Sequence, residues 1–455
     1  MKAIELDVTK DLEVMLGDPK KAIKSMMVPL IVSYLVVQLN IFADMSWCSG
    51  LGSNASSAVS SIFPIYWIIS GFGIGIGVGA STSIARYLGR DDKASADSVA
   101  TQTMVLAVFF GIVVTPILLL AMDPMITWMG IGDIRKECTD YIIPMVWSSA
   151  ILIVNGAIAG VVRAEGAAKK SMVILLSAAI LNIILDPILI YGLDMGLLGA
   201  GCATAISTAI STAIGLYWYR RKMMYIDISF KGFRVNIEQM KDVLFVGIPR
   251  VTESTLISIM SLIQRFLIVP VAGMMGIAFY NVPWRYVSIA MVISQAAGSA
   301  LIPVCSAALG QNDNVKAEAG YRYSFRITVA VMTIMAVFVF IFADYLVLPF
   351  AFSDSMVQYR EEFAHGLRIY ALFFPFMGMV DIGSSILQSL RMAQMSMVMA
   401  FIRNGFLVVL MLFAHTMDDF YWQLFATEVL GGMTMMAMAA YEFRKYKRKR
   451  MLIGV

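Results

Sequence analysis

The chain has 455 residues, of which 59% are hydrophobic and 15% are charged, and its formal net charge is +4. A soluble chain of this length is typically about one quarter charged and cannot hide so much apolar surface in a water-excluded core. The composition therefore excludes an ordinary soluble protein and indicates an integral membrane protein with lipid-facing apolar side chains.

Long apolar runs predict membrane-spanning helices. Runs such as VLAVFFGIVVTPILLLAM approach the roughly 20 residues that a spanning helix needs, and the ten-residue alternation of barrel strands is absent. The first 24 residues are mixed and charged, so we expect no cleavable signal. We predict an all-α membrane protein with about twelve spanning helices, near residues 25–47, 55–84, 98–122, 139–161, 170–193, 197–219, 242–270, 276–308, 321–347, 361–389, 394–415 and 419–442.

Lys and Arg predict the orientation of these helices. They collect before the first predicted helix and after the second, fourth and sixth, and the tail FRKYKRKR is the densest group. Arg135 and Lys136 are the main exceptions in the other connections. The positive-inside rule then places both termini in the cytoplasm, in a multi-pass protein of the cell membrane. We interpret the tail as an anchor at anionic lipid and expect no nucleic-acid partner.

The cysteines and histidines do not have metal-ligand spacing. No CxxC pair joins the four cysteines, and we expect free, buried thiols at Cys48, Cys138, Cys202 and Cys305. His365 and His415 lie near predicted outer helix ends, where a packing role is the simpler interpretation.

Two segments repeat between the halves of the chain. SIARYLGRDDKASAD (83–97) resembles CSAALGQNDNVKAE (305–318), and each segment follows a Gly-containing helix. We predict two six-helix bundles related by a pseudo-two-fold axis along the membrane normal, a construction typical of transporters that rock about a central cleft. The predicted parts are the bundle 1–219, a basic linker 220–241, the bundle 242–443 and a basic tail 444–455.

The segment GFGIGIGVGA (71–80) favours helix packing over nucleotide binding. A dinucleotide loop must follow a strand and open a helix, whereas these glycines lie inside an apolar spanning run. Gly71, Gly75 and Gly79 recur every fourth residue, the pattern that lets helices approach closely.

Buried acids are the strongest functional signal. Asp186 lies in an apolar run, Asn182 precedes it by one helical turn, and counting at about 1.5 Å per residue puts Thr204 of the next helix at a similar depth. Asp44 lies close to the outer end of the first predicted helix, so all four side chains could converge. They offer hard oxygen ligands for a small cation such as Na⁺, or two coupled proton sites.

Other interpretations of these acids stay open. Asp44 could be a solvated helix-end residue, and Asp186 could cap backbone groups freed by Pro187. Yet a charge at the membrane centre costs about 2.5–3.5 kcal/mol on insertion scales, so such residues usually line a cavity and have a function.

The second half offers Glu253 and Asp381, both near mid-depth by the same count. They either form a second acidic site or pair structurally with an arginine, the choices being Arg250, Arg265 and Arg285. Aromatic side chains could add a surface for an organic cation, at Trp284, Tyr280 and Phe374. The 35 methionines suit a site that repacks around varied guests.

Three stretches resemble the multidrug and toxic compound extrusion (MATE) family: NIFADMSWCSGLGSNASSA, GASTSIARYLGRDDKASA, and EGAAKKSMVILLSAAILNIILDPILIYGLDMGLLGAGCAT. The resemblance implies a twelve-helix exporter of organic, often cationic compounds, driven by inward flow of Na⁺ or H⁺. It implies a cation-coupling set at Asp44, Asn182, Asp186 and Thr204. Pro29 matches a proline tied to bending of the first helix. Glu253 and Asp381 resemble acids that other branches use.

We therefore expect a transporter, not an enzyme, without a cofactor and working as a monomer. No Walker A loop is present, so ATP is not the expected energy source. The main alternative is a flippase of the same superfamily that moves a lipid-linked saccharide; the few mid-depth cations favour the exporter. A channel would need a repeated pore signature that the sequence lacks.

Overall fold

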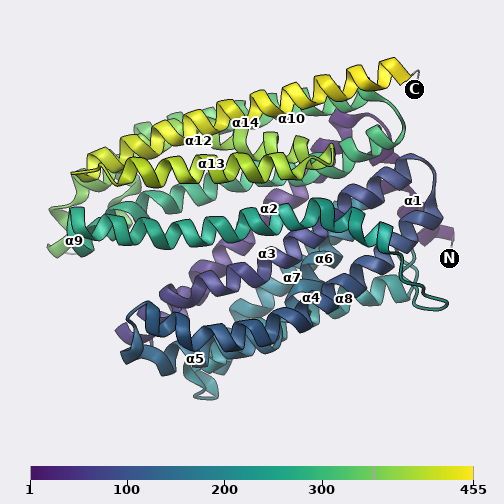
Figure 1. Cartoon of the computed structure of the whole chain (residues 1–455). Helices are drawn as coiled ribbons and strands as arrows, with labels where there is room; N and C mark the ends of the chain where they lie inside the picture. Colours follow the sequence, from purple (N-terminus) through teal and green to yellow (C-terminus); the bar gives the residue numbers. More distant parts are fainter. Residues whose placement is uncertain (1, 352–353, 454–455) are drawn as a thin grey trace. The chain divides into compact units, whose positions relative to one another are not determined.

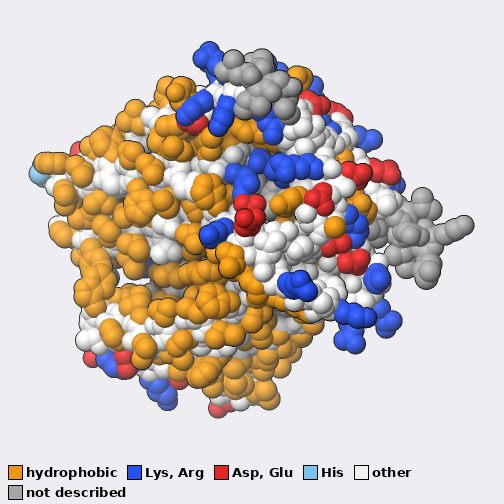
Figure 2. All heavy atoms as spheres, turned by 45° about the vertical axis from the view of Figure 1, so that its right-hand side comes forward, with side chains coloured by type: hydrophobic (Ala, Val, Ile, Leu, Met, Phe, Trp, Pro, Cys, Tyr) orange, Lys and Arg blue, Asp and Glu red, His pale blue; other side chains and the backbone are white. Residues whose placement is uncertain are grey.

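The computed structural model describes residues 2–351 and 354–453, and in these ranges it contains helices and loops without any β-strand. Within the described part of the chain, eleven helices are long and apolar enough to cross a membrane, or twelve if one bent pair counts as a single span. The predicted all-α fold with about twelve spans is thus confirmed. Figure 2 shows apolar side chains over much of the face in view and Lys and Arg gathered toward one side of it.

The chain forms two compact units. Unit 1 comprises residues 1–255 with 302–313, and unit 2 comprises residues 256–301 with 314–455. The division into a bundle 1–219, a linker 220–241, a bundle 242–443 and a tail 444–455 stays a prediction.

In unit 1, α3, α4 and α6 pack against one another, and α2 packs on α7 (Figure 1). The helices that lie wholly in unit 1 are α1 (Lys2–Leu16), α2 (Pro19–Ser49), α3 (Ser53–Gly89), α4 (Lys93–Trp128), α5 (Arg135–Trp147), α6 (Ser149–Ala164), α7 (Ala168–Pro187) and α8 (Gly196–Arg220).

In unit 2, α12 packs against α10 and α14, and α13 packs against α14. The helices that lie wholly in unit 2 are α10 (Asn314–Leu346), the short α11 (Asp354–Val357), α12 (Arg360–Ser389), α13 (Ala393–Met411) and α14 (Met417–Ile453).

The long α9 (Ile237–Gly310) contributes to both units and contains two spans, Ile237–Gly273 and Met275–Gly310. They meet at Gly273, whose combination of φ 61° and ψ −163° is readily adopted only by glycine. The predicted helices 242–270 and 276–308 correspond to these two spans.

The predicted fourth span, 139–161, is bent. The segments Gly132–Trp147 and Ser149–Ala164 meet at an angle of 55°. Pro144 has no amide hydrogen to donate, and the Ser148 hydroxyl donates to the Pro144 carbonyl oxygen at 2.7 Å. A serine bonded back to its own helix favours a bend at this position.

Glycines bring α3 into close contact with two neighbours in unit 1. A Cβ atom on Gly79 would lie 2.1 Å from the Val243 carbonyl oxygen, and one on Gly160 of α6 would lie 2.4 Å from the Cα of Gly77. The predicted packing role of the glycine-rich segment is confirmed, because only glycine fits where the backbones approach this closely.

The sequence repeat also appears as a repeated turn. Asp91 after α3 and Asn312 after α9 have φ values of 60° and 62°. In both turns the backbone amide of an aspartate donates a hydrogen bond to the carbonyl oxygen five residues earlier, Asp92 to Tyr87 and Asp313 to Ala308.

The basic linker is held to unit 1 by side chains that form hydrogen bonds with its backbone amides and carbonyl groups. Asp97 accepts from the Asp227 amide at 2.9 Å, and Thr101 accepts from the Ser229 amide at 3.3 Å. Gln102 donates to the Arg234 carbonyl oxygen at 2.7 Å. The linker is therefore an ordered part of unit 1.

Glu165, between α6 and α7, holds the start of this linker. The carboxylate is 2% exposed and accepts hydrogen bonds from the Tyr219 hydroxyl at 2.7 Å and from the amides of Tyr225 and Ile226 at 2.7 and 3.1 Å. Burial raises the pKa of Glu165 to about 7, although these bonds and the charge of Lys170 act in the opposite direction.

The raised pKa of Glu165 should make the stability of the folded protein depend on pH. Between about pH 4.5 and pH 7 the unfolded chain ionises Glu165 while the folded chain keeps its proton, so stability falls as pH rises through this window. The contribution is about 3 kcal/mol at most. Thermal unfolding in detergent from pH 5 to pH 8 should show a smaller fall in Tm for Glu165→Gln than for wild type. Parallel curves would contradict this assignment.

Candidate functional site

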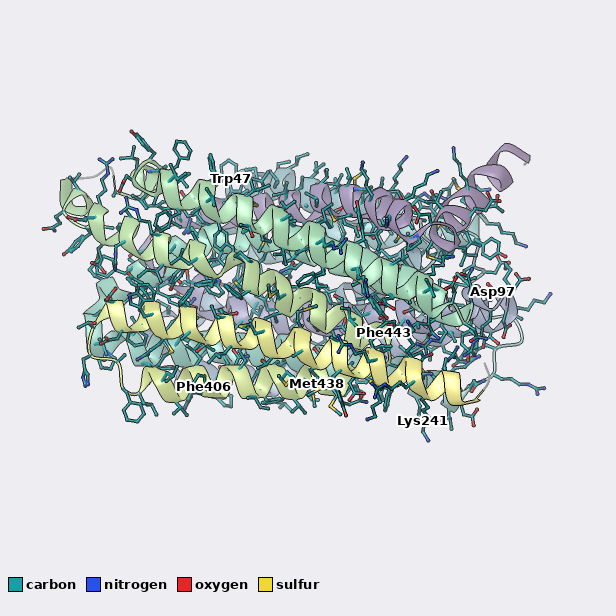
Figure 3. All side chains as sticks on the ribbon, turned by 90° about the horizontal axis from the view of Figure 1, so that it is seen from above. Trp47, Asp97, Lys241, Phe406, Met438 and Phe443 are labelled. Carbon is teal, nitrogen blue, oxygen red and sulfur yellow. The ribbon has the colours of Figure 1, made fainter. Side chains whose placement is uncertain are left out.

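Asp44 lies near the end of α2 and is buried. The Tyr141 hydroxyl on α5 donates a hydrogen bond to its Oδ2 atom at 2.8 Å, and Cys48, one turn later on α2, places its sulfur 3.9 Å from Oδ1. Figure 3 shows the neighbouring Trp47 and the linker-contacting Asp97 at opposite ends of unit 1. Asp44 therefore lies toward the end of the helices that is remote from the linker.

Asn182, Asp186 and Thr204 form a second group next to it. The Asn182 amide nitrogen lies 3.1 Å from Asp186 Oδ1 and 3.3 Å from Thr204 Oγ1, which joins α7 to α8. Asn40, one turn before Asp44 on α2, donates from its side-chain amide to the Asn182 side-chain oxygen Oδ1. The structure thus brings all of the predicted coupling residues to one region of unit 1.

Asp186 is fully buried, and among the described residues its Oδ2 atom has no hydrogen-bond partner. Asp186 shares a hydrogen-bond network with α2, because Asn182 bonds both to Asp186 and to Asn40, one turn before Asp44. Pro187 follows, and the chain continues as a π-helical turn, Ile188–Gly192. Such turns inside spanning helices often occur at functional sites.

The donor set is chemically suited to a proton or a small hard cation. Two carboxylates, a carboxamide oxygen and a hydroxyl supply oxygen ligands of the kind that such cations prefer. In the described ranges, no group of three or more His, Cys, Asp or Glu lies together in a way that could hold a metal ion.

Two members of the network were not predicted from the sequence. Tyr141 lies 97 positions after Asp44, and no local pattern connects them. Asn40 could have been found, because it is a polar residue in an apolar run one turn before Asp44 and therefore shares its helix face.

Pro29 lies inside α2, which continues through it from Pro19 to Ser49. The Ser33 hydroxyl donates to the Pro29 carbonyl oxygen at 2.8 Å. Proline also removes one backbone hydrogen bond of the helix, so α2 is locally weakened at this buried position.

Glu253 and Asp381 lie in different units. Glu253 forms an ion pair with Arg250 at 2.9 Å, one of the pairings that the sequence left open. Asp381 on α12 accepts a hydrogen bond from Ser294. Of the four free cysteines, three are buried as expected, whereas Cys202 is only partly buried.

Comparison with known proteins identifies the class. The MatE family profile matches residues 29–188 and 249–413, more than half of the chain. The chain therefore belongs to the MatE family, whose members are transporters and not enzymes. It is a multi-pass membrane protein.

Relatives and solved structures agree with this assignment. The multidrug export protein MepA of Staphylococcus aureus is 27% identical over 253 residues, which cover 55% of this chain and 56% of MepA, so the match spans about half of that relative. A crystal structure of MATE in complex with MaL6 has a TM-score of 0.92 at 26% identity and covers 96% of this chain and 99% of its own.

A MOP superfamily transporter from Pyrococcus furiosus gives the same TM-score of 0.92 at 27% identity, with 96% of this chain and 99% of its own covered. It is described as having a binding pocket of reverse polarity, which suggests a different function for that protein.

Proposed function

We propose that the chain is a secondary active exporter of small organic, often cationic compounds, driven by inward flow of H⁺ or Na⁺. The observation that carries this proposal is the buried group of Asp44, Asn182, Asp186 and Thr204 in membrane-spanning helices. Intramembrane carboxylates are costly and usually have a functional role. The name of MepA, a multidrug export protein, supports export as the direction and multiple drugs as the cargo.

The proposed cycle exposes one site alternately to the two sides of the cell membrane. Binding of the cation at Asp44 and Asp186 changes the charge of the group and favours bending of α2 at Pro29, which reshapes the space available to the substrate. A ligand shifts such an equilibrium only by its differential affinity for the two states. Cation and substrate must therefore weaken each other's binding by the same factor.

We propose further that the protein works as a monomer with both termini in the cytoplasm. Glu253 and Asp381 are proposed as a lower-ranked second acidic site, since Glu253 already has Arg250 as a counter-ion.

Dye accumulation in inverted membrane vesicles tests this function, because their cytoplasmic face points outward and export therefore runs into the lumen. The pH and Na⁺ gradients are imposed separately; we expect accumulation under at least one gradient, and the effective gradient identifies the coupling ion. In the same vesicles, an impermeant thiol reagent should label a cysteine introduced at Lys449, while intact cells should stay unlabelled. Absence of transport under both gradients would reject ion-driven export, and labelling of intact cells would reject the orientation.

A further inference from the structure

A buried ion pair joins α13 to α14 within unit 2. Arg403 Nη1 lies 2.9 Å from Glu428 Oε2, and the two side chains are 14% and 6% exposed. Gly431, one turn after Glu428, makes room for the arginine, since a Cβ there would lie 2.4 Å from Arg403 Cδ. A small residue at this point allows the long side chain to lie against α14.

The pair lies deep in the spanning part of both helices. Glu428 follows the first residue of α14 by eleven positions, roughly 16 Å along the axis, and Arg403 precedes the last residue of α13 by eight positions, roughly 12 Å. The helices α13 and α14 pack along each other. Figure 3 labels Phe406 on α13 and Met438 on α14. Both charges are thus withdrawn from water in the middle of apolar helices.

Aromatic side chains lie on the same side of α14 as the turns before the carboxylate. Tyr421 and Leu424, two turns and one turn before Glu428, pack in one buried cluster with Tyr280 and Tyr370. Tyr280 stacks on Trp284 with ring centroids 5.6 Å apart and planes at 13°, and Tyr370 meets both rings edge-on. A buried carboxylate beside aromatic faces is the chemistry that recognises an organic cation.

A purely structural role explains this arrangement poorly. Apolar residues hold two spanning helices together as well as a buried ion pair, without the cost of desolvating two charges. Buried charges inside a membrane bundle usually have a function beyond packing.

We propose that Glu428 is a cation-binding carboxylate and that Arg403 is its internal counter-ion, which an organic cation with an aromatic body displaces. This inference rests on the proposed export of organic cations and adds a binding site in unit 2. Arg403 occupies the carboxylate when the cation is absent. The arginine therefore competes with the cation, and its removal tightens cation binding.

Equilibrium binding of ethidium to purified protein in detergent, without any ion gradient, tests the competition. Glu428→Gln should weaken ethidium binding at least tenfold, because the carboxylate is lost. Arg403→Gln should tighten it severalfold, because the competing charge is lost while an amide remains to contact Glu428. Arg403→Lys, which keeps the charge, should stay within about twofold of wild type, a difference too small to indicate a lost or gained charge pair.

The matched control is the more exposed pair of Arg368 and Asp344 in the same unit, 2.6 Å apart. Arg368→Gln should leave the ethidium Kd unchanged. A neutral dye of similar size should bind all variants alike. Size-exclusion profiles and Tm values show which variants are folded. If Arg403→Gln is not folded, the rise in Tm that ethidium causes is compared between wild type and Arg403→Lys. A larger rise in wild type would overturn the proposal.

Opposite shifts for Glu428→Gln and Arg403→Gln support the competition. If both variants weaken binding, or neither changes it, the pair is structural and this inference fails while the proposed function stands. If wild-type protein binds no ethidium or other organic cation, the proposed function itself fails.

Discussion

Replacing either Asp44 or Asp186 by asparagine is expected to abolish ion-driven dye efflux while the protein still inserts and folds. Asparagine keeps the shape and most hydrogen bonds of the side chain, including the bond that Asp44 accepts from Tyr141. It cannot take up a proton or supply the negative charge that holds a cation. We expect each single variant to lose at least about tenfold in initial efflux rate, which corresponds to about 1.4 kcal/mol.

The double variant should be no worse than either single variant, because neighbouring residues of one functional unit are not additive. Dye accumulation in inverted vesicles under imposed pH and Na⁺ gradients measures all three. Asp123→Asn is the matched control, since Asp123 is an exposed carboxylate of unit 1 paired with Arg135. Wild-type rates in both single variants would end the coupling hypothesis.

Enlarging Gly160 is expected to destroy the folded protein. A Cβ at this position would lie 2.4 Å from the Cα and the carbonyl oxygen of Gly77, so α3 and α6 would have to separate. We expect Gly160→Ala to cost about 1–3 kcal/mol and Gly160→Leu to cost more, because backbone cannot move aside as a flexible side chain can.

Folded yield and Tm in detergent measure this effect. Gly405→Ala on α13 serves as the control, since no atom lies within 4 Å of a Cβ placed there. It should be neutral or slightly stabilising, as alanine favours helix over glycine. Equal yields for Gly160→Leu and wild type would show that the two helices can pack without this contact.

Much of the site was predictable because its residues are close in sequence. Asn182 and Asp186 are one turn apart on a single helix, so their shared face follows from the helical period. Thr204 followed from counting residues down the next helix. Tyr141 could not be found in this way. Its contact with Asp44 depends on how α5 packs on α2, and local residue spacing does not predict how two helices pack.

The same limit applies to the fold. Hydropathy located the spans, because each spanning helix must present about 20 predominantly apolar residues to the lipid. It could not show the bend at Ser148, which depends on how a hydroxyl competes for the Pro144 carbonyl. Nor could it show that residues 237–255 and 302–313 pack with unit 1, because backbone approach at glycines such as Gly75 and Gly247 is a tertiary event.

Unit 1 is built from two separate stretches of the chain, residues 1–255 and 302–313, and this has a consequence for biogenesis. Its glycine-lined α3 is complete when residue 89 has been synthesised, yet Gly89 packs on the backbone of Ala307, which is 218 residues later (307 minus 89). At about 5–20 residues per second the ribosome needs roughly 10–45 s to bridge that interval. Gly77 of α3 can pack on α6 as soon as Gly160 has been made, whereas Gly89 lacks its backbone partner throughout this time. Insertion in chain order and completion of unit 1 are therefore separate events. Unit 1 enters the membrane first, but it is complete only after residues 302–313 have been synthesised.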